Sequence, residues 1–205
     1  MSISIYQLKP RFQQLLRPGL AALARAGVTP NQVTLGAMLL SLLYGGALAL
    51  WPERAALWFG LPLFLLLRMA LNAIDGMLAT ATGNKTPLGA LLNELCDQVS
   101  DAALYLPFAL AAGVMPALVV GVVLAALLAE FAGVLAQTIG APRGFEGPMG
   151  KSDRAFAFGL IALLLGAGVG PAWPNGLLVL VLLLSALTVF NRLRRALRPC
   201  APGTR

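Results

Sequence analysis

The sequence predicts an all-α membrane protein with six transmembrane helices, preceded by an amphipathic helix at the membrane surface. Of its 205 residues, 59% are hydrophobic and only 11% are charged, whereas a soluble domain carries about 25% charged residues. Apolar stretches that are long enough to span a bilayer recur along the chain, and most Lys and Arg residues gather in alternate connections. Neither an internal repeat nor a separate soluble domain is evident, so we expect one compact domain.

Six predicted spans follow from the length of the apolar stretches, because a membrane helix needs about 20 residues at about 1.5 Å each. They cover residues 32–50, 55–78, 87–112, 116–139, 155–169 and 176–193. Residues 6–26 alternate apolar and basic side chains at helical spacing, which is typical of a helix lying in the headgroup region. We therefore divide the chain into a juxtamembrane segment (1–30), a membrane domain (31–198) and a basic tail (199–205).

The distribution of positive charge predicts the topology. The two end segments and the connections 80–87 and 141–154 hold nearly every Lys and Arg, whereas the turn at 113–116 and the stretch 166–176 carry no charge. The positive-inside rule then places both termini in the cytoplasm of a bacterial inner membrane. Because the charges flank apolar spans, the net charge of +7 indicates anionic lipid rather than nucleic acid as the partner.

Other features exclude some kinds of site. The chain has no His, which removes the commonest general base and zinc ligand. Its two cysteines, Cys96 and Cys200, have no metal-binding spacing. The long polar, basic stretch before the first apolar span argues against a secretory signal peptide.

Four of the eight acidic residues gather near the facing ends of the second and third predicted spans: Asp75, Glu94, Asp97 and Asp101. At about 100° per residue, Asn93, Glu94, Asp97 and Asp101 share about a quarter of the helix circumference, and Asn72 and Asp75 lie about 60° apart on theirs. Carboxylates are costly in a membrane and usually functional there. The alternative is a set of helix-end carboxylates that face cytoplasmic water.

Carboxylates clustered in this way repel one another unless a cation lies between them. Hard oxygen ligands favour Mg²⁺, Mn²⁺ or Ca²⁺ over zinc, and such an ion can neutralise charge during phosphoryl transfer. A nearby carboxylate could accept a proton from an attacking hydroxyl. Gly76, Gly83 and Gly89 would permit close backbone approach to a phosphate, although ordinary helix ends also explain them.

These residues resemble the signature of the CDP-alcohol phosphotransferase family, which comprises membrane enzymes of phospholipid synthesis. The family signature reads D-x-x-D-G-x-x-A-R, followed after a short loop by G-x-x-x-D-x-x-x-D. Here residues 72–80 read N-A-I-D-G-M-L-A-T and residues 89–97 read G-A-L-L-N-E-L-C-D. The entrance to the first span (29–34) and Gly150-Lys151 at the fifth span also resemble family elements.

The resemblance implies a donor linked to CDP, such as CDP-diacylglycerol, an alcohol or phospho-alcohol acceptor, Mg²⁺ or Mn²⁺ as cofactor, and a homodimer. Asp97 would bind metal or act as the catalytic base. The candidate metal ligands are Asp75, Asp97, Asn72, Asn93, Glu94 and Asp101. The candidate nucleotide-binding residues are Thr34, Asn72, Gly76, Ala79, Thr80, Lys85 and Gly89. The acceptor or its phosphate would contact Arg143, Lys151 and Arg154, unless these residues only anchor the loop. A helix cap also explains residues 29–34.

The chain departs from the signature at Asn72, Asn93 and Thr80, where the family has two aspartates and an arginine. The site could therefore hold one metal or two. The leading hypothesis is transfer of a phosphatidyl group from a CDP-linked lipid to an alcohol, with release of CMP. A catalytically impaired member that binds nucleotide or lipid is the alternative; a transporter fits less well, because the polar residues gather toward one face.

Two further expectations concern the membrane interior. Arg68 and Glu130 are predicted to lie at similar depth and to pair, because pairing lowers the cost of a charge in the membrane. Gly133, about one turn after Glu130, is expected to permit close helix packing or a dimer contact.

Overall fold

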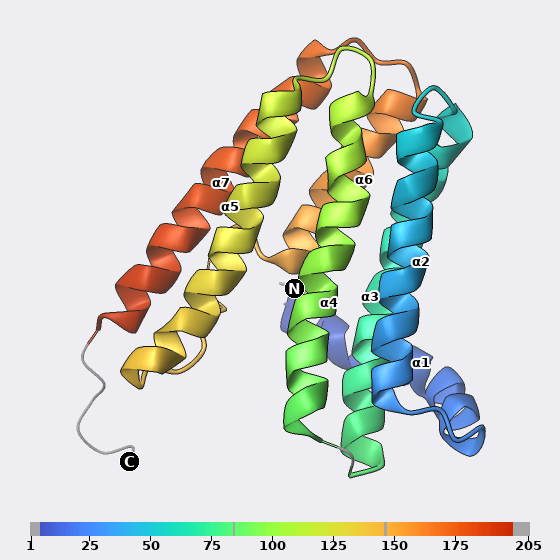
Figure 1. Ribbon diagram of the computed structural model, residues 1–205, viewed down its shortest axis with the longest axis vertical. Coiled ribbons are helices and arrows are strands. Elements are labelled where there is room, and N and C mark those ends of the chain that lie inside the picture. The colour runs from blue at the N-terminus through green and yellow to red at the C-terminus, as the bar shows by residue number, and fades with distance from the viewer. Residues whose placement is uncertain (1–4, 84, 146, 199–205) are drawn as a thin grey trace. The chain divides into compact units, whose positions relative to one another are not determined.

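The computed structural model describes residues 5–83, 85–145 and 147–198, and within these residues every regular element is a helix. The elements are α1 (Ile5–Arg25), α2 (Pro30–Leu50), α3 (Ala55–Ala81), α4 (Pro87–Tyr105), the 3₁₀ turn η1 (Leu106–Leu110), α5 (Pro116–Leu135), the 3₁₀ turn η2 (Ala136–Ile139), α6 (Lys151–Gly166) and α7 (Ala172–Ala196). Figure 1 shows these elements. The predicted all-α class is confirmed, while the predicted tail at 199–205 and Cys200 lie outside the described residues.

Among the residues that the structure describes, four helices are long and apolar enough to cross a membrane: Pro30–Leu50, Ala55–Ala81, Pro116–Ile139 and Ala172–Ala196. They match four of the six predicted spans closely. The predicted third span contains α4, which carries three acidic residues, and the predicted fifth span contains α6, which has only 16 residues. The six-span count and the interfacial position of α1 therefore stay predictions.

The chain forms two compact units, and the boundary between them falls inside α2, α3 and α4. The first unit comprises Met1–Leu43 and Phe64–Asp101, and the second comprises Tyr44–Leu63 and Ala102–Arg205.

The first unit is held together by an apolar cluster. Val33, Ile74 and Leu78 are buried, and Leu20 and Leu23 of α1 pack against them. These contacts join α1 to the first part of α2 and the second part of α3. Leu15 of the same helix is exposed.

Matching Thr-Pro pairs start α2 and α4. Thr29 Oγ1 accepts a hydrogen bond from Gln32 N at 3.3 Å, and Gln32 Oε1 accepts one from Thr29 N at 2.9 Å, which is a capping box. Thr86 Oγ1 accepts a hydrogen bond from Gly89 N at 3.0 Å. Pro follows each Thr at the first helical position, where its missing N–H costs nothing. The alternative of a helix cap is therefore confirmed for Thr29.

In the second unit, α5 packs along α7, and α6 also packs against α7 (Figure 1). Its core contains an aromatic cluster in which the Tyr105 and Phe158 rings stack at 3.9 Å, and Phe108 meets both Trp58 and Phe158 edge to face. α6 begins at Lys151, four residues before the predicted span 155–169, and Gly150 N donates to Asp153 Oδ2 at 2.9 Å at its start.

Candidate functional site

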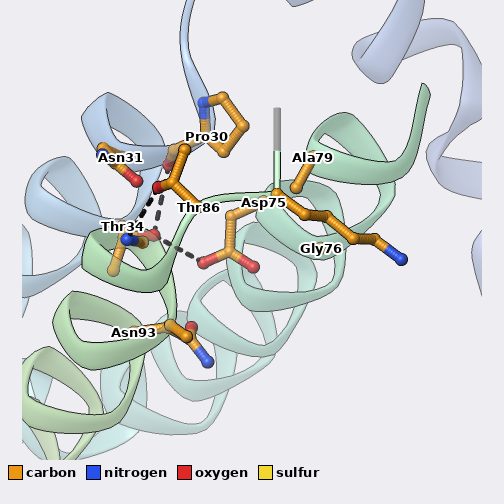
Figure 2. A pocket seen from close by; sticks show the side chains of 11 residues that line it. Pro30, Asn31, Thr34, Asp75, Gly76, Ala79, Thr86 and Asn93 are labelled. Carbon is orange, nitrogen blue, oxygen red and sulfur yellow. Dashed lines mark hydrogen bonds between the residues drawn. The ribbon is translucent and has the colours of Figure 1, made fainter. Parts of the chain in front are cut away.

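A cavity of about 250 Å³ lies in the first unit, between the starts of α2 and α4 and the end of α3. Its lining comprises Pro30, Asn31, Thr34, Asp75, Gly76, Ala79, Lys85, Thr86, Gly89, Ala90 and Asn93. Figure 2 shows side chains from all three helices around this space. The cavity therefore brings together five of the seven candidate nucleotide-binding residues with two of the candidate metal ligands.

Asp75 is the acidic residue of this cavity, and its side chain points toward Thr34 (Figure 2). The Thr34 hydroxyl lies 2.8 Å from Asp75 Oδ2 and 3.1 Å from the Pro30 carbonyl oxygen. Both partners are acceptors, so the single hydroxyl proton serves one of them at a time. Asp75 is only 6% exposed, and the bond to α2 fixes its orientation.

Gly89 lines the cavity at a point where a side chain would collide with its neighbours. A Cβ at this position would lie 2.9 Å from Asn31 Oδ1 and 3.1 Å from Thr86 Oγ1. Asn31 and Thr86 were not predicted as site residues. The Thr-Pro starts of α2 and α4 could have indicated them, because the helix starts line the cavity.

A second groove of about 610 Å³ lies on the other side of Gly76, between α1 and α3. Gly76 belongs to both linings, and this groove also contains Asn72 and Thr80, together with Arg17 of α1. Three predicted nucleotide-binding residues, Asn72, Gly76 and Thr80, therefore line this groove. Thr80 donates a hydrogen bond to the Gly76 carbonyl oxygen at 2.9 Å.

The deeper acidic residues, Asp97 and Asp101, lie around a buried arginine that sequence reasoning did not assign to them. Arg68 forms an ion pair with Asp101, and its Nη2 lies 3.5 Å from Asp97 Oδ1. Arg68 also donates to the Asp97 carbonyl oxygen at 3.0 Å, and Asn72 Nδ2 donates to Asp97 Oδ1 at 2.8 Å. We call these four residues the Arg68 network.

The basic candidates lie in the second unit, around one glutamate. Glu130 on α5 accepts hydrogen bonds from Arg154 at 3.0 Å and from Arg192 at 3.1 Å, and Arg143 lies 3.9 Å from it. Arg192 also donates to the Ala129 carbonyl oxygen. We call these residues, Glu130 with its three arginines, the Glu130 cluster. Lys151 is half-buried at the start of α6.

The predicted pair between Arg68 and Glu130 is wrong, because each of the two has ion partners in its own unit. Equal distance from the ends of two predicted spans did not identify the partners of Arg68 and Glu130. Helical spacing could have indicated these partners better than depth did. Arg68 precedes Asn72 by about one turn of α3, and the buried residues Ser185, Thr188 and Arg192 form a polar stripe on α7.

Because Gly133 has no side chain, the loop backbone at Gly144 approaches it closely. The Gly144 amide donates to the Gly133 carbonyl at 3.1 Å, and a Cβ on Gly133 would lie 2.6 Å from the Gly144 oxygen. The close approach that we expected is present, but its partner is the segment between η2 and α6.

The donor set decides which ion the first unit could hold. Among the described residues, no group of three or more Asp, Glu, His or Cys side chains is placed to share one metal. The cavity nevertheless offers the Asp75 carboxylate and the Asn93 amide oxygen. Mg²⁺ usually binds through one or two carboxylates and completes its shell with water and substrate phosphates, so these residues fit one such ion. Glu94 is half-buried on α4 and is not part of either lining.

Comparisons with known proteins identify the family of this chain. The model of the CDP-alcohol phosphatidyltransferase family matches residues 27–191. The chain is 45% identical to the inner membrane protein YnbA of Escherichia coli (strain K12) over 198 residues, covering 95% of this chain and 97% of that protein. It is 30% identical to the phosphatidylinositol phosphate synthase of Mycobacterium marinum, covering 93% and 82% of the two chains.

Solved structures show the same fold. The phosphatidylinositol phosphate synthase of Mycobacterium tuberculosis with CDP-DAG bound has a TM-score of 0.77 at 20% identity, covering 92% of this chain and 99% of that chain. The same synthase in complex with manganese and citrate has a TM-score of 0.74 at 21% identity, covering 90% and 92%. Since the family model covers most of the sequence and the apolar helices are those of a membrane protein, the chain belongs to the CDP-alcohol phosphatidyltransferase family of membrane transferases.

Proposed function

We propose that the protein transfers a phosphatidyl (or related phospho-alcohol) group from a CDP-linked lipid to the hydroxyl of an alcohol, with release of CMP. The observation that carries this proposal is the cavity in the first unit. It gathers Thr34, Asp75, Gly76, Ala79 and Gly89 from three helices, and these are positions at which the family resemblance places nucleotide and metal. The proposal also draws on relatives that are named phosphatidylinositol phosphate synthases.

In this proposal the cavity binds the CDP part of the donor. Gly76 and Gly89 let the diphosphate approach the backbone, while Asp75 and Asn93 would hold a divalent cation. When bound, Mg²⁺ or Mn²⁺ supplies charge neutralisation at the phosphate oxygens. Thr34 orients the Asp75 carboxylate through the 2.8 Å hydrogen bond. Lys85 lies at the exposed edge of the lining, where its charge would attract the nucleotide.

Asp97 is the proposed base toward the acceptor hydroxyl. Its Oδ1 accepts a hydrogen bond from Asn72 and lies 3.5 Å from Arg68 Nη2, and these contacts would orient the carboxylate. The side chain is 18% exposed, so a hydroxyl group could reach it. General-base catalysis by a side chain contributes about 10²–10⁴-fold to a rate.

The acceptor is proposed to be a phosphorylated alcohol. The Glu130 cluster contains three arginines and one glutamate, so it carries two positive charges in excess. Arginine suits phosphate because its planar fork can donate two parallel hydrogen bonds. Arg143 and Lys151 are only partly buried, so solvent reaches these two side chains. We further propose, from the charge distribution of the sequence, that the reacting site faces the cytoplasm.

The experiment is CMP release by the detergent-purified protein, given CDP-diacylglycerol, Mg²⁺ or Mn²⁺, and a panel of alcohols and phosphorylated alcohols. We expect release that needs a metal and one phosphorylated acceptor. Asp97→Asn should lower the rate by about 100-fold or more. Glu53→Gln is the matched control, because Glu53 is exposed in the connection between α2 and α3. Release with unphosphorylated alcohols alone would contradict the proposed acceptor.

A second candidate function is binding of CDP-lipid without turnover. The observation that favours it is the direct hydrogen bond between Asn72 and Asp97, which engages the proposed base. Saturable binding of CDP-diacylglycerol, with no CMP release for any acceptor or metal, would establish this candidate and exclude the transferase.

A further inference from the structure

Arg68 occupies a place in the first unit where a cation is required. Its side chain is 4% exposed and lies between two carboxylates: it forms an ion pair with Asp101, and its Nη2 lies 3.5 Å from Asp97 Oδ1. Two carboxylates about one turn apart in one helix, Asp101 buried and Asp97 partly buried, repel each other without a positive charge between them. The guanidinium is a permanent positive charge, so the chain itself offsets one of the two negative charges and separates the carboxylates.

Asn72 adds to this arrangement. It lies about one turn after Arg68 on α3, and its Nδ2 donates to Asp97 Oδ1 at 2.8 Å. Asp97 Oδ1 therefore faces two groups with positively polarised hydrogens. A divalent cation at the same oxygen would have to displace the amide and lie beside the guanidinium, and like charges in a buried site disfavour each other.

The net charge of the polar residues leads to the same result. Asp75, Glu94, Asp97 and Asp101 contribute four negative charges, and Arg68 contributes one positive charge. The sum of −3 is sufficient for one divalent cation, whereas two such ions would leave an excess of positive charge before any phosphate binds.

We propose that Arg68 takes the place of a second divalent cation, so that this protein binds one Mg²⁺ or Mn²⁺ per chain, at the Asp75 end of the site. This inference rests on the proposed function and determines how its metal is used. Arg68 is a positioning residue: it holds Asp97 and Asp101, and it is not among the residues that line the cavity. The single ion would lie with Asp75 and Asn93, and the donor phosphates would complete its shell.

The test counts Mn²⁺ ions bound to the full chain in detergent, by metal analysis after equilibrium dialysis and by electron paramagnetic resonance. We expect one Mn²⁺ per chain in the wild type and one in Arg68→Lys, which keeps the positive charge. The double variant Arg68→Met with Asn72→Asp removes the guanidinium and adds a carboxylate. It should bind two Mn²⁺ per chain and show the spin coupling of a close pair. Two ions in the wild type, no ion in the wild type, or one ion in the double variant would each overturn the inference.

Two further measurements keep the test decisive. If the double variant does not fold, Asn72→Asp alone adds the carboxylate while Arg68 remains; we expect one Mn²⁺, and two would overturn the inference. Where the double variant folds, Mn²⁺ should raise its unfolding temperature more than that of the wild type, and an equal shift would contradict the second ion.

Failure of this inference is distinguishable from failure of the proposed function. One Mn²⁺ per wild-type chain without any CMP release would refute the transferase and leave the single-cation site intact. Metal-dependent CMP release by a wild-type chain with two Mn²⁺ would refute the role of Arg68 and leave the transferase intact.

Discussion

The Arg68 network and the Glu130 cluster each hold charged side chains of low exposure in ion pairs, but with opposite ratios of arginine to carboxylate. In the first unit one arginine serves two aspartates, and in the second unit one glutamate serves three arginines. The first arrangement keeps one negative charge in excess and the second keeps two positive charges. Each cluster offsets part of its own charge by internal ion pairs. The Glu130 cluster keeps the positive sign that its proposed phosphate ligand needs, whereas the Arg68 network leaves the proposed cation to Asp75 and Asn93.

The largest loss of stability is expected when Glu130, at the centre of the Glu130 cluster, is replaced. Glu130→Gln leaves three arginines, two of them almost fully buried, without their shared carboxylate. Loss of one partner from a buried ion pair costs about 3–5 kcal/mol, so the free energy of unfolding should fall by at least that amount. It can be measured by SDS titration of the detergent-solubilised protein. Glu53→Gln, at an exposed position, should change it by less than about 0.5 kcal/mol; similar losses in the two variants would contradict the role of Glu130.

Arg68→Met is the equivalent change in the first unit. It leaves Asp97 and Asp101 without their guanidinium, and we expect a loss of about 3 kcal/mol in buffer with EDTA, at the lower end of the range for a broken buried pair. Arg54→Met is the control, because Arg54 is exposed and lies 5.1 Å above the Trp51 ring. Should the two variants unfold alike, the Arg68 network would not be a stabilising element.

A smaller loss of stability is expected when a methyl group is added to a glycine that packs closely, beginning with Gly133 beside the Glu130 cluster. An added Cβ would lie 2.6 Å from the Gly144 carbonyl oxygen and 3.3 Å from Arg192 Nη1. A backbone atom cannot move aside without moving its loop, so Gly133→Ala should cost about 1–3 kcal/mol. Gly121→Ala on the same helix is the control, since its Cβ would meet only Leu182 at an ordinary 3.6 Å. Equal stability of the two variants would show that the loop adjusts freely.

Gly89→Ala is expected to have the smallest effect on stability. Its Cβ would meet the side-chain ends of Asn31 and Thr86 at 2.9 and 3.1 Å, and such ends can rotate away. We expect a loss below about 1 kcal/mol, as for a mild overpacking change, together with weaker binding of CDP-diacylglycerol because the added methyl group narrows the cavity. Unchanged binding in a lipid-overlay or calorimetric measurement would indicate that the donor does not contact Gly89.

The starts of α2, α4 and α6 were predictable because their signals are local. Thr29-Pro30, Thr86-Pro87 and Gly150-Lys151 encode helix starts within a few residues. The grouping of Thr34, Asp75 and Gly89 in one cavity was also predictable, from a family pattern of fixed spacing. Lengths and apolar composition gave four spans that the structure confirms by the same criteria.

The sequence by itself determined the all-α class, the helix starts and the set of chemically capable residues, because propensity, capping and apolar length act over short distances. Only the tertiary structure decided which charges pair. Arg68 could have met any acid at its depth, and Glu130 any base. Packing of α3 against α4 places Arg68 in ion-pair contact with Asp97 and Asp101. Packing of α5 with α6 and α7 places Glu130 in ion-pair contact with Arg154 and Arg192. Coulomb attraction does not depend on sequence separation, so partner choice is fixed only when the helices are in place.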